Sequence, residues 1–460
     1  MPACNSEIGS TAAGSRNRCL WVASREIRQN GAPQHYRMRL PSSPRHDGVM
    51  GVHETIDLRL SRRGIGPRKI SAELDLLSIC LRWPPTEERC NTLRGKDLGT
   101  LDWSRFMRLL HHHQGHAFAS EAFREAGVQP PDAVAEILVH RSRQTALRGL
   151  RLAAETCRLA TRLKGEGISP LFVKGTPLAV LAYGSIILKH SLDIDLLVEP
   201  QQVGPVYDLL VAEGYLLCEP RGMRRSQLDR FVTIGKECAL YDRRRGVLVE
   251  LHWRLTDNPR LLGGVSACSP RRTVFVEGAG RLPTLTDPDL FAYLCVHGTA
   301  HGWWRLKWLA DVNALLAGRP ALEIENLHRS AVERGAGRAS SVALLLCHDL
   351  FELELDHDFE RRLRSSRATR LLIAIALRAV AGRDGDRPVS RPVMRALVEC
   401  SHLLIGEGWS FLARELSRRW TGAAEQLAVP LPGFLHVLYV IIRPPLWLLR
   451  RMRELRSPSR

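Results

Sequence analysis

LDIDLLV, at residues 192–198, is the stretch that decides the predicted fold. Side chains alternate between the two faces of a β-strand, so Asp193 and Asp195 are predicted to share one face while the apolar residues turn to a core. Two carboxylates on one face of an otherwise apolar strand are costly unless a cation or water compensates them. Carboxylate oxygens suit Mg²⁺ or Mn²⁺, which favours a metal site here. The alternative is that both aspartates are ordinary solvent-facing strand residues.

A third carboxylate stands in the stretch VLVELHW, residues 247–253. The same alternation puts Glu250 and His252 on one face of this strand, opposite its apolar residues. If the strand lies beside residues 192–198, Glu250 completes a cluster of three carboxylates. Such a cluster can hold two metal ions across a triphosphate and stabilise both the attacking and the leaving oxygen. His252 is predicted to lie just outside it.

Upstream, a short apolar strand at residues 171–173 is followed by Lys174 and Gly175, and then by a helix that we expect to start at Thr176 and Pro177. A strand, a glycine turn and a helix N-terminus supply backbone N–H groups and a positive dipole suited to phosphate, and Lys174 adds a positive charge. The GxxxxGK[ST] pattern of a Walker A loop is absent. The alternative is a tight turn with no ligand.

Strand and helix patterns alternate around these stretches. Strand patterns occur at 171–173 and 192–198 and as an antiparallel pair within 231–242 and 247–253, and helix patterns occur at 178–183 and 201–213. We therefore predict a small α/β (α+β) unit with a mixed sheet. Apolar residues at helical spacing on either side, for example in 134–163 and 290–316, predict N- and C-terminal helical regions.

Five segments follow from these patterns. They are a basic, disordered segment at 1–70, a helical region at 71–166, the core at 167–286, a helical domain at 287–425 and an apolar, basic tail at 426–460. Residues 1–70 hold 12 Lys or Arg against 5 Asp or Glu and show no apolar period. The tail is interrupted by Arg443 and two prolines, so it is a poor membrane span. It allows weak peripheral membrane contact, and the alternative is a hairpin packed on the protein's own surface.

The charge balance and the cysteines limit the setting in which the chain works. The 66 Lys and Arg residues outnumber 48 Asp and Glu, and the formal net charge is +18. This excess favours a polyanionic partner such as nucleic acid or nucleotide, although arginines on solvated helix faces would explain it equally well. The eleven cysteines form no CxxC pair and no zinc-finger spacing. Scattered thiols and the absence of a secretory leader pattern in the first thirty residues predict a cytoplasmic, reducing location.

The combination of several short stretches resembles a known family. FVKGTPLAVLAYG, SLDIDLLVEP, EGY and VLVELHWRL together resemble the uncharacterised nucleotidyltransferase family of the polymerase-β superfamily. Members occur in bacterial polysaccharide and lasso-peptide biosynthetic settings, and abortive-infection nucleotidyltransferase toxins are similar in layout. The resemblance covers roughly residues 75–400, including LDWSRFMRLL and HGTAHGWWRLKWLADVNALL. It implies a polymerase-β-like core flanked by helical regions.

The resemblance also implies roles for particular residues. It implies a catalytic Mg²⁺ site on Asp193 and Asp195, with Glu250 as the third acid. Gly175 and Thr176 fall at the position of the superfamily's glycine–small-residue phosphate turn. Lys189 stands where the family tends to carry arginine, four residues before the first aspartate. Lysine keeps the charge but loses bidentate phosphate recognition.

A later stretch carries histidines, tryptophans and charges at three- and four-residue spacing. His297, His301, Trp304, Lys307 and Asp311 are predicted to lie along one side of a single helix. The pair His297 and His301 could bind metal, but the glutamate of an HExxH zinc site is absent. We expect His297, His301 and Asp311 either to line the nucleotide or acceptor pocket, or to form a polar network between domains.

Together these features predict a metal-dependent nucleotidyltransferase that moves a nucleoside monophosphate from an NTP to an acceptor hydroxyl and releases pyrophosphate. Mg²⁺ or Mn²⁺ is the expected cofactor, and the acceptor is a small molecule, peptide, protein or RNA. One alternative is a toxin-like enzyme that modifies tRNA or another RNA. Another is a catalytically inactive, nucleotide-binding scaffold protein, for which Lys189 is the hint. The preferred base, the acceptor and the oligomeric state do not follow from the sequence.

Overall fold

The computed structural model describes residues 70–381, 392–429, 431–432, 435, 438–439 and 441–442. The predicted disordered segment therefore lies outside the described residues except for its last position, and so does most of the predicted tail. Within the described part of the chain, no helix is long and apolar enough to cross a membrane. The described residues form one compact unit.

A five-stranded mixed sheet lies at the centre of the predicted core. Its strands, in spatial order, are β1 (Leu171–Phe172), β2 (Asp193–Leu197), β5 (Val247–His252), β4 (Glu237–Asp242) and β3 (Leu216–Glu219). Only the β2–β5 pair is parallel, and its register places Asp195 directly beside Glu250. The antiparallel pairing of β4 with β5 confirms the hairpin predicted within 231–242 and 247–253. Residues before β4 are wrongly predicted as strand, because Leu228–Ile234 forms helix α9.

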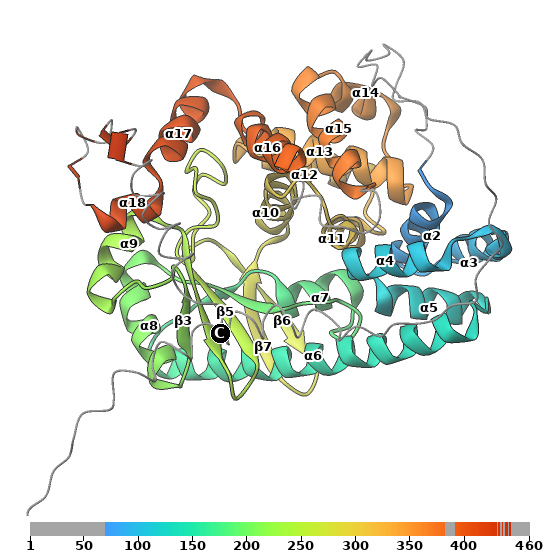
Figure 1. Ribbon diagram of the computed structural model, residues 1–460, viewed down its shortest axis with the longest axis horizontal. Helices are drawn as coiled ribbons and strands as arrows, with labels where there is room; N and C mark the ends of the chain where they lie inside the picture. The colour runs from blue at the N-terminus through green and yellow to red at the C-terminus, as the bar shows by residue number, and fades with distance from the viewer. Residues whose placement is uncertain are drawn as a thin grey trace, which may run out of the picture. The chain divides into compact units, whose positions relative to one another are not determined.

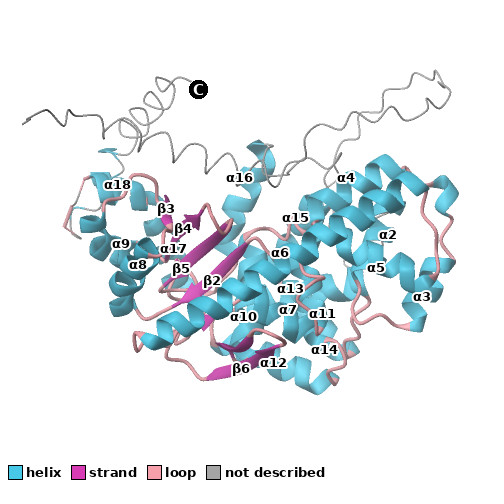
Figure 2. Ribbon diagram, turned by 90° about the horizontal axis from the view of Figure 1, so that it is seen from below, coloured by secondary structure: helices cyan, strands magenta, loops and turns pink. Residues whose placement is uncertain are grey.

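One face of this sheet is covered by the long helix α6 (Asp132–Gly165). Leu159 and Leu163 of α6 share an apolar core with Leu196 of β2 and Val249 of β5. Figure 1 shows α6 running beneath the sheet, and Figure 2 shows the strands between α6 and the end that carries α8 (Val203–Ala212) and α9. The alternating acids of β2 and β5 are left on the opposite face. The period-two pattern in the sequence thus separates a dry face from a polar one.

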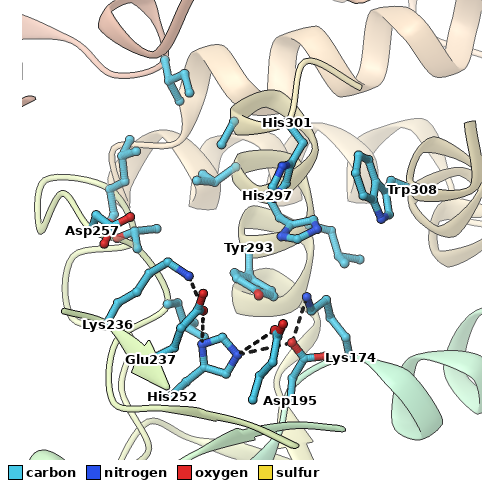
Figure 3. Close-up of a pocket in the computed structure, with 18 of the residues that line it drawn as sticks. Lys174, Asp195, Lys236, Glu237, His252, Asp257, Tyr293, His297, His301 and Trp308 are labelled. Carbon is cyan, nitrogen blue, oxygen red and sulfur yellow. Dashed lines mark hydrogen bonds and ion pairs between the residues drawn. The ribbon is translucent and has the colours of Figure 1, made fainter. Parts of the chain in front are cut away.

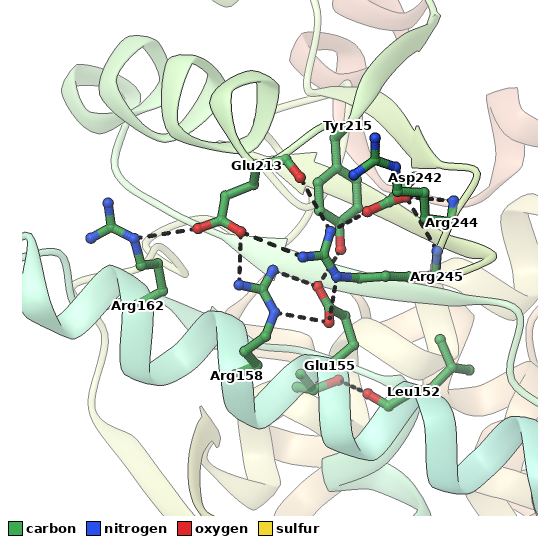
Figure 4. A network of polar contacts seen from close by, with 10 residues as sticks. Leu152, Glu155, Arg158, Arg162, Glu213, Tyr215, Asp242, Arg244 and Arg245 are labelled. Atoms are coloured by element: carbon green, nitrogen blue, oxygen red, sulfur yellow. Dashed lines mark hydrogen bonds and ion pairs between the residues drawn. The ribbon is translucent and has the colours of Figure 1, made fainter.

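A polar network fixes α6 to the edge of the sheet (Figure 4). The carboxylate of Glu155 accepts hydrogen bonds from Tyr215 Oη at 2.6 Å and from Arg158 Nη2 at 2.7 Å. Arg158 also reaches Glu213 at 2.8 Å, and Arg245 contacts both glutamates. Each buried charge in this network has an opposite partner, which offsets the cost of removing it from water.

Two helical regions flank the sheet and share one apolar core. The N-terminal helices are α2 (Ala72–Leu81), α3 (Glu87–Arg94), α4 (Trp103–His113), α5 (His116–Ala126) and α6. The C-terminal helices are α10 (Asp287–Ala300), α11 (Leu306–Leu316), α12 (Ala321–Glu333), α13 (Gly337–Phe351), α14 (His357–Arg364), α15 (Arg367–Val380), α16 (Pro392–Ser401), α17 (Gly408–Thr421) and α18 (Ala423–Ala428). The predicted fold class, a small mixed sheet flanked by helices, is confirmed. The domain boundaries stay predictions.

Two local expectations are wrong, and one hairpin was not predicted. The single helix predicted over 290–316 is two helices, because Gly302 and Trp303 both adopt positive φ and reverse the chain. The second hairpin, β6 (Arg271–Val276) with β7 (Gly280–Leu285), was not predicted, since Pro283 and exposed arginines obscure its strand pattern. Helix α7 (Gly175–Tyr183) begins one residue before the expected Thr176 cap.

Candidate functional site

A cavity of about 580 Å³ opens on the polar face of the sheet. The predicted acids Asp193, Asp195 and Glu250 all line it. The wall opposite the sheet comes from α10 and α11, and Figure 3 shows Tyr293 and His297 of α10 above Asp195 and His252. The same-face prediction for residues 192–198 thus agrees with the position of both aspartates in one cavity.

Asp195 is the buried centre of the site. Its Oδ1 lies 2.9 Å from Lys174 Nζ and 3.3 Å from His252 Nε2, and its side chain is 1% exposed. Neither carboxylate oxygen has a hydrogen bond of good geometry. Burial alone would raise the pKa of Asp195, but Lys174 and His252 outweigh it and hold that pKa well below its usual range. Asp195 is therefore ionised at neutral pH.

Asp193 is in a different electrostatic position. Burial, with repulsion from Asp195 and Glu250, raises the pKa of Asp193 to about 7, against the opposing attraction of Lys174 and Lys307. A third nearby negative charge is therefore disfavoured unless a cation arrives. Two neighbouring acids with such separated pKa values are typical of functional sites, although structural networks also produce them.

His252 contacts carboxylates on three neighbouring strands, namely Asp195 on β2, Glu250 on β5 and Glu237 on β4. Its Nε2 faces Asp195 and lies 3.6 Å from Glu250, and its Nδ1 lies 3.0 Å from Glu237. Burial lowers the pKa of His252, but these carboxylate contacts prevail and raise it to about 10. The imidazole is thus protonated and acts as a countercharge in the absence of a metal.

Glu237 was not predicted as a site residue. It pairs with His252 across β4 and β5, and its carboxylate also contacts the ammonium group of Lys236. Burial raises the pKa of Glu237, but His252 and Lys236 bring it below its usual range. The two-residue period of a strand could have identified Glu237. Cys238 and Leu240 point to the apolar core, so Glu237 falls on the opposite, polar face of the same strand.

The chemistry of the donors suits a divalent cation. Asp195, Glu250 and His252 each offer a ligand atom, and these atoms lie within 4.8 Å of one another. The two Asp195 oxygens without good hydrogen bonds are available for such an ion. Asp193 lines the same cavity but is outside this compact set among the described residues. The set therefore differs from the predicted trio by exchanging Asp193 for His252.

The predicted phosphate turn lies directly against the acids. Lys174 immediately precedes the first residue of α7, and its ammonium group forms an ion pair with the Asp195 carboxylate. Gly175 has φ +58°, and a Cβ there would lie 3.3 Å from the Asp193 carbonyl oxygen. Lysine and glycine both line the cavity, whereas Thr176 is buried and is not part of the wall. The first-turn amides of α7, like those of any α-helix, have no partner within the helix, and such amides can bind phosphate.

Lys189 is buried in an ion pair that the sequence did not reveal. Its Nζ lies 2.7 Å from Asp311 Oδ2, and Tyr183 Oη donates to Asp311 Oδ1 at 2.8 Å. The predicted nucleotide-binding lysine and the predicted pocket residue Asp311 are therefore partners. Lys189 still lines the cavity, but its charge is matched by the protein itself.

Residues 99–352, more than half of the chain, match the family model described as uncharacterised nucleotidyltransferase. The chain belongs to this nucleotidyltransferase family. The match contains every element of the sheet and both helices α10 and α11. No curated protein and no solved structure gave a significant match.

An aromatic part of the cavity wall, formed by His297, His301 and Trp308, also lies within the nucleotidyltransferase match. The ring of Trp308 lies 5.4 Å from that of His297 and 5.1 Å from that of His301, although α10 ends at Ala300 and α11 begins only at Leu306. Burial and nearby Lys174 lower the pKa of His301 to about 4 and hold that of His297 well below its usual value, so both are neutral at pH 7. The turn brings to the cavity residues that a single helix was expected to align.

Part of the cavity wall lies beyond the nucleotidyltransferase match. It comes from α16, α17 and the turn between them: Arg395, Val398, Glu399, His402, Ile405, Phe411, Glu415 and Arg418. Asn258 Nδ2 donates to Glu415 Oε2 at 3.3 Å and to the Phe411 carbonyl, which ties this wall to the loop after β5. No sequence pattern pointed to these residues.

Proposed function

We propose that this nucleotidyltransferase moves a nucleoside monophosphate from an NTP to an acceptor hydroxyl. The observation that carries the proposal is the adjacency of Asp195 and Glu250 on parallel strands, with His252 beside them, inside a cavity large enough for a nucleotide. A cavity of 300–1,000 Å³ is typical of small-molecule sites. We assign the fold to the polymerase-β superfamily and the source to bacteria, as the sequence resemblance implies, and the working location to the cytoplasm, as the scattered thiols predict.

The acids and the Lys174 turn have separate roles in this proposal. Asp193, Asp195 and Glu250 hold Mg²⁺ or Mn²⁺, with His252 as a further ligand or as the group that orients Asp195. A bound divalent cation supplies positive charge for the attacking and leaving oxygens. Lys174 pairs with Asp195 and, with Gly175 and Thr176, forms the turn that binds the triphosphate.

The reaction itself is a displacement at the α-phosphorus. The acceptor oxygen forms a bond to phosphorus while the bond to the oxygen of pyrophosphate breaks. Glu250 is the side chain that takes the acceptor proton, because it is more exposed than Asp195, with 27% of its side chain accessible against 1%. Pyrophosphate leaves with the negative charge of the broken bond.

The acceptor defines the main rival activity. The formal net charge of +18 supports RNA, including tRNA, as an acceptor, and a small molecule, peptide or protein is the other class. An inactive, nucleotide-binding scaffold is less well supported, because its one hint was Lys189 and that lysine has a structural partner in Asp311.

The test is transfer of label. The protein is incubated with each α-³²P-labelled NTP, Mg²⁺ or Mn²⁺, and cell lysate, and labelled products are separated with and without ribonuclease. We expect one labelled product and released pyrophosphate. The variant Asp195→Asn should lose the labelling, while Asp208→Asn, at an exposed ion pair on α8, should keep it. Equal labelling by Asp195→Asn refutes the site, and nucleotide binding without any pyrophosphate supports the scaffold.

A further inference from the structure

The lysines of the cavity wall are not equivalent. Four line it, namely Lys174, Lys189, Lys236 and Lys307. The first three pair with Asp195, Asp311 and Glu237, respectively. Among the described residues, no carboxylate lies within ion-pair distance of Lys307. Its ammonium group instead donates to the carbonyl oxygen of His190 at 3.0 Å.

The surroundings of Lys307 compensate its charge only in part, because the attraction of Asp193 and Asp311 is outweighed. Burial, with repulsion from Lys189 and Arg305, lowers the pKa of Lys307 well below its usual value. A buried cation of this kind is costly until an anion approaches it. Lys307 is also the second residue of α11, where the positive end of the helix dipole favours an anion.

The position of Lys307 relates it to the reacting centre. Lys307 and Asp193 line the same cavity. Asp193 and Asp195 lie where the α-phosphate must be held for transfer. A cation elsewhere in the wall of this cavity is therefore available for the phosphates that follow the α-phosphate.

We propose that Lys307 binds the β- and γ-phosphates of the NTP and the pyrophosphate product, the task predicted from the sequence for Lys189. This inference rests on the proposed nucleotidyl transfer. Lys189 becomes a positioning residue: it holds Asp311, which lies one helical turn after Lys307 on α11 and so fixes that helix in the wall.

The test measures phosphate binding by calorimetry in the presence of Mg²⁺. The probes are inorganic tripolyphosphate, the four NTPs and the four nucleoside monophosphates. Lys307→Met should bind tripolyphosphate and the preferred NTP about 10- to 100-fold more weakly, as expected for the loss of one charge-assisted hydrogen bond. Monophosphate affinity should change by less than about twofold. Lys307→Arg should bind the NTP within a few-fold of the unmodified protein.

Two controls make the result specific. Lys164→Met removes one lysine from the exposed end of α6 and should leave every affinity unchanged. In the unmodified protein, tripolyphosphate should protect Lys307, but not Lys164, from acetylation detected by mass spectrometry. This second measurement decides the question even if Lys307→Met does not fold.

The outcomes separate the two proposals. If the unmodified protein binds no NTP and releases no pyrophosphate, the proposed function is refuted. If it binds and turns over an NTP while Lys307→Met binds equally well, or while Lys307 is acetylated at the same rate with tripolyphosphate, only the role of Lys307 is refuted. An equal loss of monophosphate and triphosphate binding in Lys307→Met also overturns that role.

Discussion

The Lys174–Asp195 ion pair offers a direct measure of the electrostatics of the site. At 2.9 Å and an effective dielectric constant of about 20, the two charges attract each other by roughly 6 kcal/mol. Removing one partner of a buried pair typically costs about 3–5 kcal/mol, because the other charge stays buried. Asp195→Asn also relieves the repulsion that raises the pKa of Asp193. We therefore expect a loss near 3 kcal/mol in the free energy of unfolding.

The assay is urea denaturation at pH 7 in EDTA, applied to Asp195→Asn, Lys174→Met and the double variant. The double-mutant cycle should give a coupling energy of about 2–3 kcal/mol. The matched control is the pair Asp208–Arg225, which is as close, at 2.6 Å, but whose side chains are 56% and 43% exposed. Its coupling should stay below about 1 kcal/mol because water screens it. Equal coupling energies for the two pairs would refute the reasoning that burial makes the first pair strong.

Other properties of the fold can be tested in the same way. Mn²⁺ or Mg²⁺ at a hundred times its Kd should stabilise the protein by about 2.7 kcal/mol, seen as a higher Tm that EDTA reverses, and Glu250→Gln should lose this gain. Burial lowers the pKa of His328 to about 4, so below pH 6.5 only the unfolded chain takes up that proton and stability falls. His328→Gln should flatten this fall by about 1.4 kcal/mol per pH unit in denaturation at pH 6.5 to 4.5, and an unchanged slope contradicts it. Gly149→Ala would place a Cβ 2.2 Å from the Ile186 carbonyl oxygen and should cost about 1–3 kcal/mol in thermal unfolding, whereas Gly165→Ala, in open space on the same helix, should not destabilise.

Local patterns predicted the acidic strands well. The aspartates and Glu250 follow the two-residue period of a strand with one buried face, and that period is set by the backbone alone. The sequence could therefore place Asp193 and Asp195 together. Their distance from Glu250 depended on a parallel pairing that joins strands about fifty residues apart, and the register of that pairing was an expectation until the structure described it.

Long-range partners could not be predicted. Lys189 pairs with a residue 122 positions away, and no local pattern identifies such a partner. The α10–α11 break depends on Trp303, whose buried ring fills the space beside Gly298 and leaves no room for a Cβ there. The helical spacing of apolar residues continues through this turn, so the spacing alone predicts one helix. The metal and nucleotide roles stay predictions for the experiments above.

The divided wall of the cavity has a consequence for how this protein can diverge. The acids, their strands and α11 belong to the family match, whereas α16 and α17 lie beyond its end at residue 352. The two portions meet around one space but are encoded far apart. Mutations in residues 392–421 can therefore reshape what the cavity admits without altering the strands that carry the acids.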